Sequence, residues 1–363
     1  MVVFCHISCV FSPGLCFISK AETNFEKIWL NTPLNIITNG NTAVQFFFVA
    51  SGLLIARNTY YKVVSNRDSQ PLEKRIFALF KITTPAITFS WLLMCFHLMF
   101  HQDALLLNSN LSFLESYNSF DPSVPKYLVE MFLGVFVKGS DFVGPLWTIR
   151  IELLGALITS SIAYYIYKNK HRGLYTYAFM SVVLLFINEN LCAFMFGATV
   201  WDIIVRKNRI PDIISKIVLY VEYSNVIKCL LLLLGLYLAC CNMYLTGVYS
   251  IFKHIFPVGS VIRSAGISLC VLIFFLSPRI QSYFSTKQLV SLGEVSAYVY
   301  AFHWQIILSL GCGMFILFSN RVDYTICVIL ISISCLTVSI LLAFCYKAVK
   351  ERVLSYCKKK ISV

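Results

Sequence analysis

Charged residues are scarce in this sequence of 363 residues: Asp, Glu, Lys and Arg together make up 13% of it, about half the fraction usual in soluble domains. Hydrophobic residues make up 58%, and the mean hydropathy is +0.75. This composition excludes an ordinary soluble domain and predicts a polytopic membrane protein. We expect an all-α fold with about ten transmembrane helices in one bundle, because the connecting segments are too short to hold a second domain.

Several catalytic and cysteine motifs are also missing. The sequence has no G-x-S-x-G nucleophile elbow, no P-loop and no G-x-G-x-x-G fingerprint, so covalent serine chemistry has no support. Its 14 cysteines include no C-x-x-C pair and no metal-ligand spacing. Most of them lie in apolar runs, which predicts small buried side chains. We therefore expect no disulfide framework, no redox role and no bound metal.

The basic residues are unevenly distributed along the chain. A net charge of +13 would suggest a nucleic-acid partner in a soluble protein, but in a membrane protein the placement of the charges sets the orientation. With the N-terminus in the cytoplasm and ten crossings, most Lys and Arg residues fall on cytoplasmic segments. We therefore expect both termini in the cytoplasm and no nucleic-acid partner. We divide the chain into a membrane domain, residues 1–346, and a basic tail, residues 347–363.

Apolar runs mark the crossings that we expect. Residues 127–137 form an apolar patch that is too short to cross and predicts an interfacial or re-entrant helix. A tight helical hairpin is expected to turn near Asn188 and Asn190. The expected spans are 1–19, 36–56, 81–100, 146–167, 174–190, 191–205, 227–249, 261–278, 290–317 and 324–346.

The chain is organised around residues 144–158, GPLWTIRIELLGALI. This span carries Arg150 and Glu152, and ionisable residues inside a membrane are costly unless they face a polar interior. Two residues apart on a helix, the two side chains point about 200° away from each other and cannot pair. Each is expected to find a partner on another helix. Structural ion pairs between helices and a polar functional site both remain open.

Other polar residues lie in apolar surroundings, including His6, Gln45 and His303. A neutral histidine beside a carboxylate is the usual general base that activates a hydroxyl. Arg75 and Lys81, at the expected cytoplasmic mouth, suit a phosphorylated ligand. The residues alone thus predict a buried polar site in either an enzyme or a transporter.

Six stretches, taken together and in order, resemble the acyltransferase 3 family of integral membrane acyltransferases, which O-acylate cell-surface polysaccharides and related glycans. They cover nearly the whole chain. The stretches are VVFCHIS at 2–8, AVQFFFVASGLLI at 43–55, KRIFALFKITTP at 74–85, GPLWTIRIEL at 144–153, FMFGATVW at 194–201 and LGEVSAYVYAFHWQIIL at 292–308.

The resemblance implies a membrane O-acyltransferase, which moves groups other than aminoacyl groups. Its donor would be acyl-CoA, most often acetyl-CoA, taken from the cytoplasmic side as a substrate and not as a bound cofactor. Its acceptor would be a hydroxyl of a lipid-linked or cell-surface polysaccharide such as O-antigen. The implied location is the inner membrane of a bacterium, with the lipid bilayer as a further partner.

The resemblance also assigns roles to single residues. His6 falls on the catalytic histidine of the family, and Glu152 on the carboxylate of its LWSLxxE segment. Arg75 and Lys81 fall on the basic positions that would hold the CoA phosphates. The residues expected on the acceptor side are Gln45, Trp147, Arg150 and His303.

Two departures from the family pattern qualify these expectations. The family's first-helix arginine would lie eleven residues before His6, whereas this chain starts five residues before it, so we expect a truncated N-terminus. Lys81 stands where arginine is commoner, and a lysine cannot bind a phosphate in the bidentate manner of arginine. The alternatives are a membrane permease or transporter and an inactive, truncated member of the family.

Overall fold

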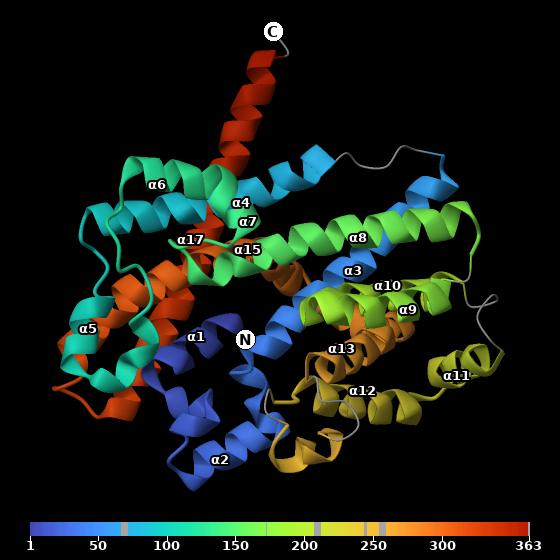
Figure 1. Cartoon of the computed structure of the whole chain (residues 1–363), viewed down its shortest axis with the longest axis horizontal. Helices are drawn as coiled ribbons and strands as arrows, with labels where there is room; N and C mark the ends of the chain where they lie inside the picture. Colours follow the sequence, from blue (N-terminus) through green and yellow to red (C-terminus); the bar gives the residue numbers. More distant parts are fainter. Residues whose placement is uncertain (67–71, 172, 207–211, 243–244, 254–258, 362–363) are drawn as a thin grey trace. The chain divides into compact units, whose positions relative to one another are not determined.

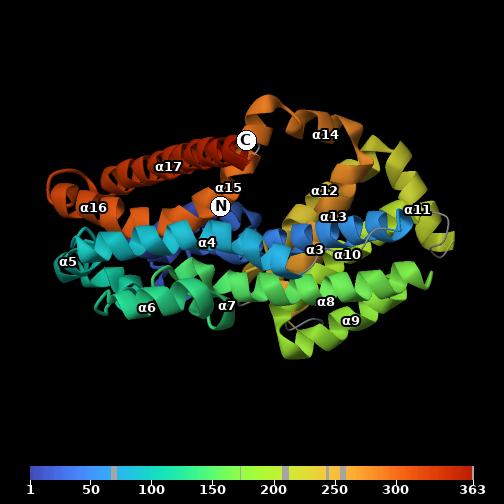
Figure 2. The same ribbon diagram turned by 90° about the horizontal axis from the view of Figure 1, so that it is seen from above.

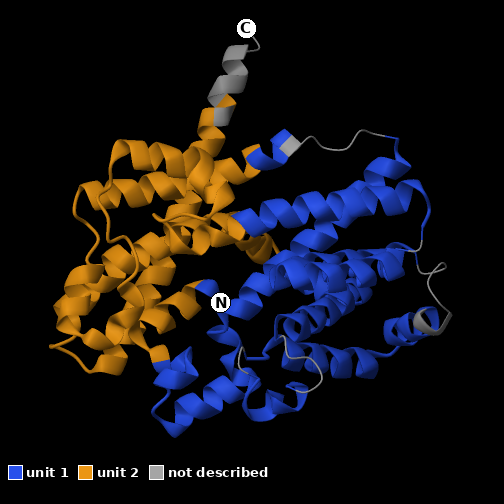
Figure 3. Ribbon diagram, viewed as in Figure 1, with its two compact units in different colours: residues 1–2, 14–76, 150–284 blue, residues 3–13, 77–149, 285–363 orange. Residues whose placement is uncertain are grey.

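The structure is a computed structural model that describes residues 1–66, 72–171, 173–206, 212–242, 245–253 and 259–361. These residues contain helices and no strand, which confirms the all-α class. The chain divides into two compact units, each described here by itself (Figure 3). Unit 1 comprises residues 1–2, 14–76 and 150–284, and unit 2 comprises residues 3–13, 77–149 and 285–363.

Most helices of the two units are labelled in Figure 1, and α14 and α16 are labelled in Figure 2. Those mainly in unit 1 are α2 (Asn24–Asn31), α3 (Gly40–Val64), α8 (Thr148–Lys168), α9 (Gly173–Ile187), α10 (Glu189–Val205), α11 (Asp212–Tyr223), α12 (Asn225–Ala239), α13 (Gly259–Leu276) and α14 (Pro278–Phe284). Those mainly in unit 2 are α1 (Val2–Phe11), α4 (Leu72–Cys95), α5 (His101–Leu107), α6 (Val124–Val129), α7 (Val135–Val137), α15 (Lys287–Ile306), α16 (Cys312–Phe318) and α17 (Tyr324–Ile361).

Five helices among the described residues are long and apolar enough to cross a membrane, or six if α11 and α12, bent by 108°, form one broken span. The five are Glu73–Cys95, Gly144–Lys168, Gly259–Leu276, Lys287–Phe318 and Tyr324–Val353. Each overlaps a span expected from the sequence, although Glu73–Cys95 begins before the expected span 81–100. The chain therefore has the helices of a membrane protein, while the full set of about ten crossings is not confirmed.

The remaining expected spans coincide with helices that are shorter or less apolar. Helix α1 has 10 residues, α9 has 15 and α10 has 17, whereas about 20 are needed to cross a bilayer at 1.5 Å per residue. Helix α3 has 25 residues, but polar residues such as Asn41 and Gln45 lower its hydropathy. The predicted hairpin is present, because Asn188 separates α9 from α10 and its side chain caps α10.

Two other sequence expectations meet different structures. The apolar patch at residues 127–137 is helical but divided into α6, a π-helical segment (Glu130–Gly134) and α7. The expected boundary between a membrane domain and a tail at residue 347 falls inside α17, which continues without a break to Ile361.

Small residues allow α3 and α10 to pack closely in unit 1. A Cβ atom at Gly52 would lie 2.1 Å from the carbonyl oxygen of Phe194, and one at Gly197 would lie 1.9 Å from that of Val49. The two helices therefore touch backbone to backbone, as small residues permit in membrane helices. The ring of Phe48 stacks on that of Phe194 beside this contact, with centroids 5.2 Å apart.

We expect Gly197→Ala to destabilise the protein by about 3 kcal/mol, because the added methyl group has no room and the backbones must move apart. Gly293→Ala is the matched control: no atom lies within 4 Å of the added Cβ, and alanine favours the helix by about 1 kcal/mol. Thermal unfolding in detergent measures both. An unchanged melting temperature for Gly197→Ala would contradict the close contact.

Candidate functional site

Two histidines that lie far apart in the sequence meet in unit 2. Nδ1 of His6, on α1, lies 2.7 Å from Nε2 of His303, on α15, across 297 residues of sequence. The two ring planes are nearly parallel, 11° apart, and the centroids lie 5.0 Å from each other, so the rings meet edge to edge. His303 is fully buried and His6 is half-buried. The structure thus brings together two of the residues that the sequence singled out.

The hydrogen bonds of His303 determine the tautomers of the pair when both rings are neutral. Nδ1 of His303 lies 2.7 Å from the carbonyl oxygen of Tyr300, and a carbonyl oxygen can only accept. Nδ1 of His303 therefore carries the hydrogen, and its Nε2 is the acceptor for His6. His6 must then donate from Nδ1, which leaves its Nε2 without a hydrogen and able to take a proton.

Two aromatic rings, those of Trp304 and Tyr117, form an aromatic wall beside His6. The Trp304 ring meets the His6 ring edge to face at 5.3 Å, and the Tyr117 ring packs against Trp304 at 4.7 Å. Trp304 is 1% exposed, and its indole Nε1–H has no acceptor among the described residues. A buried donor without a partner costs about 1–3 kcal/mol. This N–H is therefore a candidate to bind a ligand oxygen next to His6.

A third histidine lies behind this wall. His101, on α5, contacts the Tyr117 carbonyl oxygen through Nε2 at 2.9 Å, so its Nε2 carries the hydrogen. Its Nδ1 has no partner among the described residues. Burial lowers the pKa of His101, and the Tyr117 carbonyl opposes this shift. His101 is therefore neutral at pH 7 and holds Tyr117 in place.

The segment before α8 is anchored to α15. Tyr300 donates a hydrogen bond to the carbonyl oxygen of Pro145, and its hydroxyl lies 2.8 Å from Oγ1 of Thr148. Tyr300 precedes His303 by one helical turn, so these bonds fix the part of α15 that carries the histidine. Trp147, expected to bind the acceptor, is 43% exposed in this segment.

A π-helical segment, Ile307–Gly311, follows α15 directly. The backbone N–H of Ile307 bonds to the carbonyl oxygens of His303 and Trp304, and the carbonyl of Leu308 accepts from the N–H of Phe100 outside the helix. Such segments are frequent at functional sites of α-helices. Here the π-helical segment lies next to His303 and Trp304.

In unit 1, Glu152 finds the interhelical partner that its position in a span requires. Arg75, on α4, forms an ion pair with it through Nη2 and Oε1. Glu152 is 2% exposed, whereas the Arg75 side chain is 35% exposed. Nε of Arg75 has no acceptor among the described residues. The pairing favours a role for Glu152 in holding the guanidinium over one in proton transfer.

The other two expected site residues of unit 1 differ in burial. Gln45 is 2% exposed; it donates to Oδ1 of Asn190 at 2.7 Å and accepts from Oγ of Ser264 at 2.9 Å. It therefore joins α3, α10 and α13. Arg150, in the first turn of α8, is exposed, so it does not lie in a buried polar interior as the sequence suggested.

The basic residue Lys81 lies in unit 2. Its Nζ sits 4.2 Å from the centroid of the Phe77 ring. It lines a groove between α4 and α17.

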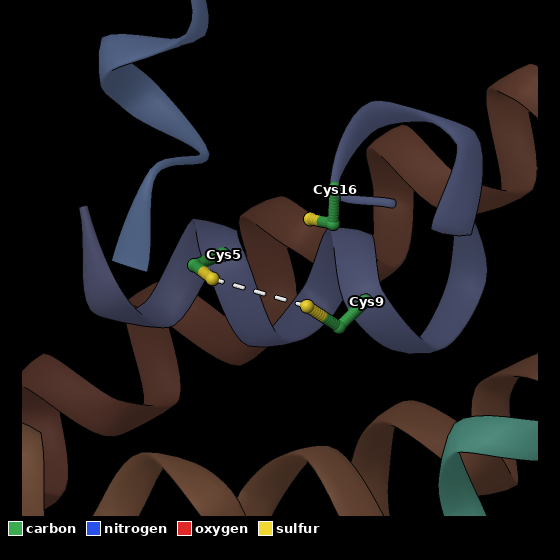
Figure 4. A group of neighbouring side chains, drawn as sticks. All are labelled: Cys5, Cys9 and Cys16. Carbon is green, nitrogen blue, oxygen red and sulfur yellow. Dashed lines mark hydrogen bonds between the residues drawn. The ribbon is translucent and has the colours of Figure 1, made fainter. Parts of the chain in front are cut away.

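The only chelating groups near His6 on its own helix are thiols. Sγ of Cys5 and Sγ of Cys9 lie 3.9 Å apart, one turn from each other on α1 (Figure 4). Cys16, also drawn there, belongs to unit 1. Two thiols one turn apart are fewer than the four ligands of a structural zinc site.

Sequence reasoning missed Trp304 and His101 as candidate site residues. Trp304 follows His303 directly, so its position was available, but tryptophan is usually a packing residue. Only the structure shows that its N–H is buried without an acceptor. Comparisons with protein-family models, with curated proteins and with solved structures found no match.

We expect the two single variants of the Arg75–Glu152 pair to differ. Arg75→Ala leaves a buried carboxylate without a cation and should cost about 3 kcal/mol. Glu152→Gln leaves an arginine that water can partly solvate and should cost about 1 kcal/mol. The double variant Arg75→Ala/Glu152→Gln should cost less than the sum of the two single variants. Melting temperatures in detergent measure all three, and an equal or larger loss for Glu152→Gln would contradict this account.

Proposed function

We propose that this protein is a membrane O-acyltransferase that transfers an acyl group, in the first instance acetyl, from acyl-CoA to a hydroxyl of a cell-surface or lipid-linked polysaccharide. The observation that carries the proposal is the hydrogen-bonded series Tyr300 carbonyl, His303, His6. It supplies what a hydroxyl-activating base needs: a nitrogen without a hydrogen, on a ring whose orientation is fixed from behind.

The chemistry follows from the tautomers. Nε2 of His6 takes the proton of the acceptor hydroxyl while the hydroxyl oxygen bonds to the thioester carbonyl carbon. The carbon–sulfur bond then breaks, and the CoA sulfur, the leaving group, takes this proton from Nε2 of His6. Between these steps His6 is an imidazolium, and its Nδ1–H···Nε2 bond shares the charge with His303. The buried N–H of Trp304 would stabilise the carbonyl oxygen as it gains negative charge.

In this proposal Arg75 binds a phosphate of the donor from the cytoplasmic side. Its pairing with Glu152 holds the guanidinium in one orientation, and Nε remains available as a donor. Glu152 is then a positioning residue and not a proton carrier. We infer the same topology as from the charges: about ten crossings, both termini in the cytoplasm, and the inner membrane of a bacterium.

The proposal is tested in cells by NMR of the O-acetyl groups on surface polysaccharide, with the gene intact, deleted, or carrying His6→Ala at matched protein level. We expect the acetyl signal to disappear in the deletion strain and in the His6→Ala strain. Unchanged acetylation in both would contradict O-acetyl transfer to that glycan. Substrate accumulation without acyl transfer, together with tolerance of His6→Ala, would support the transporter alternative.

We expect His303→Phe to lower kcat by about 10²-fold, because His6 loses the acceptor that fixes its tautomer. KM for acyl-CoA should change little, and the pH profile of kcat should move, which a purely structural role would not cause. His303→Gln should partly restore kcat, since its side-chain oxygen can accept the same hydrogen bond. His171→Ala, an exposed histidine, is the control. Wild-type kcat in His303→Phe would contradict the positioning role.

Trp304→Phe should lower kcat by about 10–10²-fold while leaving the protein folded, because the ring remains and the N–H is lost. Its melting temperature should stay close to that of the wild type. Initial rates with purified protein, acetyl-CoA and an acceptor glycan give the comparison. A loss of stability with unchanged kcat would mean that Trp304 only packs.

A further inference from the structure

A groove of about 660 Å³ in unit 2 is lined mainly by α4 and α17, two helices that are labelled in Figures 1 and 2. It has the volume of sites that hold a small ligand. One face of α4, from Phe77 to Leu92, forms one wall, and Leu342 to Val349 of α17 form the other. Phe302 of α15 also contributes to the lining. Nearly all of this lining is apolar.

A proline explains how the two walls are joined. Pro85 has no N–H to bond to the carbonyl of Lys81, four residues earlier in α4. That carbonyl instead accepts a hydrogen bond from Oη of Tyr346, on α17, at 3.3 Å. Such a freed backbone group must be satisfied by a neighbouring helix in a membrane. Because of this hydrogen bond, Lys81 of α4 lies opposite Tyr346 of α17.

The end of the groove at Lys81 is positively charged. Nζ of Lys81 contacts only the Phe77 ring in the described part of the chain, and no carboxylate pairs with it there. Lys347 and Lys350 follow Tyr346 on α17, and they bind Glu294 and Tyr298 respectively. Lys81 is therefore the cation in the lining of the groove whose ammonium has no hydrogen bond or ion pair among the described residues.

One further polar group lies in the groove. Oγ1 of Thr84 is buried and has no hydrogen-bond partner in the described residues. The neighbouring Thr88 is already bonded to Oη of Tyr127 at 2.8 Å and to the Thr84 carbonyl. Thr84 lies three residues from Lys81, about 4.5 Å along the helix. The groove thus offers a cation, then a hydroxyl, then an apolar wall about 12 Å long.

The two walls belong to the least buried of the five candidate spans. In both Glu73–Cys95 and Tyr324–Val353, 28% of the most apolar window is buried within the protein, against 50–61% in the other three. The outer faces of these helices therefore contact lipid in a bilayer. A ligand of this groove can enter sideways from the membrane.

We propose that the groove binds an anionic glycerophospholipid. Its phosphate contacts Lys81, an ester carbonyl accepts from the hydroxyl of Thr84, and one acyl chain lies along the apolar wall toward Leu92. Basic pockets between membrane helices recognise anionic lipid headgroups in this way. The proposal does not rest on the acyltransferase chemistry and goes beyond it, since it assigns the cation at residue 81 to a lipid and not to CoA.

The lining favours a lipid over a long-chain acyl-CoA. The adenosine and pantetheine of CoA need many hydrogen-bonding partners, whereas Lys81 and Thr84 are the polar groups of this groove without such partners among the described residues. A phospholipid needs one cation and one donor here, and its second chain can remain in the bilayer.

The test uses the full-length protein in nanodiscs of phosphatidylcholine that contain a trace of phosphatidylglycerol with a diazirine in one acyl chain. We expect photolabelled peptides from residues 77–92 and 342–349, and loss of this labelling in Thr84→Trp, which fills the groove. Labelling spread evenly over all apolar helices would overturn the proposal. So would protection by oleoyl-CoA but not by unlabelled phosphatidylglycerol, which would assign the groove to the acyl donor.

A titration followed by native mass spectrometry gives a second readout. We expect Lys81→Gln to bind phosphatidylglycerol about fivefold more weakly than the wild type, the order expected for one lysine at an anionic surface, with no change for phosphatidylcholine. Lys168→Gln is the matched control, because this lysine ends a different candidate span, outside the groove, and also sits near an aromatic ring, 5.1 Å from that of Tyr164. Equal phosphatidylglycerol binding by Lys81→Gln and wild type, with both folded, would overturn the assignment.

Discussion

Polar side chains buried among apolar helices must be satisfied by other parts of the protein, and this constraint shapes both units. In unit 1 it joins Arg75 to Glu152 and makes Gln45 a bridge between α3, α10 and α13. In unit 2 it joins His6 to His303. Buried groups that escape it, such as the indole N–H of Trp304 and the hydroxyl of Thr84, are informative, because a polar group without a partner can bind a ligand.

The sequence predicted that the polar residues within apolar helices need partners from other helices, but it did not predict which residues those partners are. Spacing alone showed that Arg150 and Glu152 cannot pair with each other, and the structure gives Glu152 a cation from another helix. That cation lies 77 residues away, and His6 and His303 are 297 residues apart. No helical period links such distant positions, so their contacts depend on tertiary packing. The exposure of the Arg150 side chain also depends on tertiary packing, so the hydropathy pattern of its span could not predict it.

Helix type was predictable, and helix extent was less so. The apolar runs marked all five helices of the described residues that are both long and apolar enough to cross, since composition determines hydropathy directly. They also suggested crossings at α9 and α10, where the hairpin at Asn188 limits the helices to 15 and 17 residues. The groove had no sequence signal of its own. It depends on Pro85, whose missing N–H leaves the Lys81 carbonyl for Tyr346 of a helix far along the chain.

Activation of a hydroxyl by His6 depends above all on the tautomer of this residue, because only a neutral ring protonated at Nδ1 presents an unprotonated Nε2 to a substrate. Nitrogen-15 NMR of protein labelled at histidine, with the His6 signals assigned by their loss in His6→Asn, measures this directly. We expect Nδ1 of His6 to carry the hydrogen, with coupling across the hydrogen bond to Nε2 of His303, and Nε2 of His6 to have the shift of an unprotonated imidazole nitrogen. A hydrogen on Nε2 of neutral His6 would contradict the account.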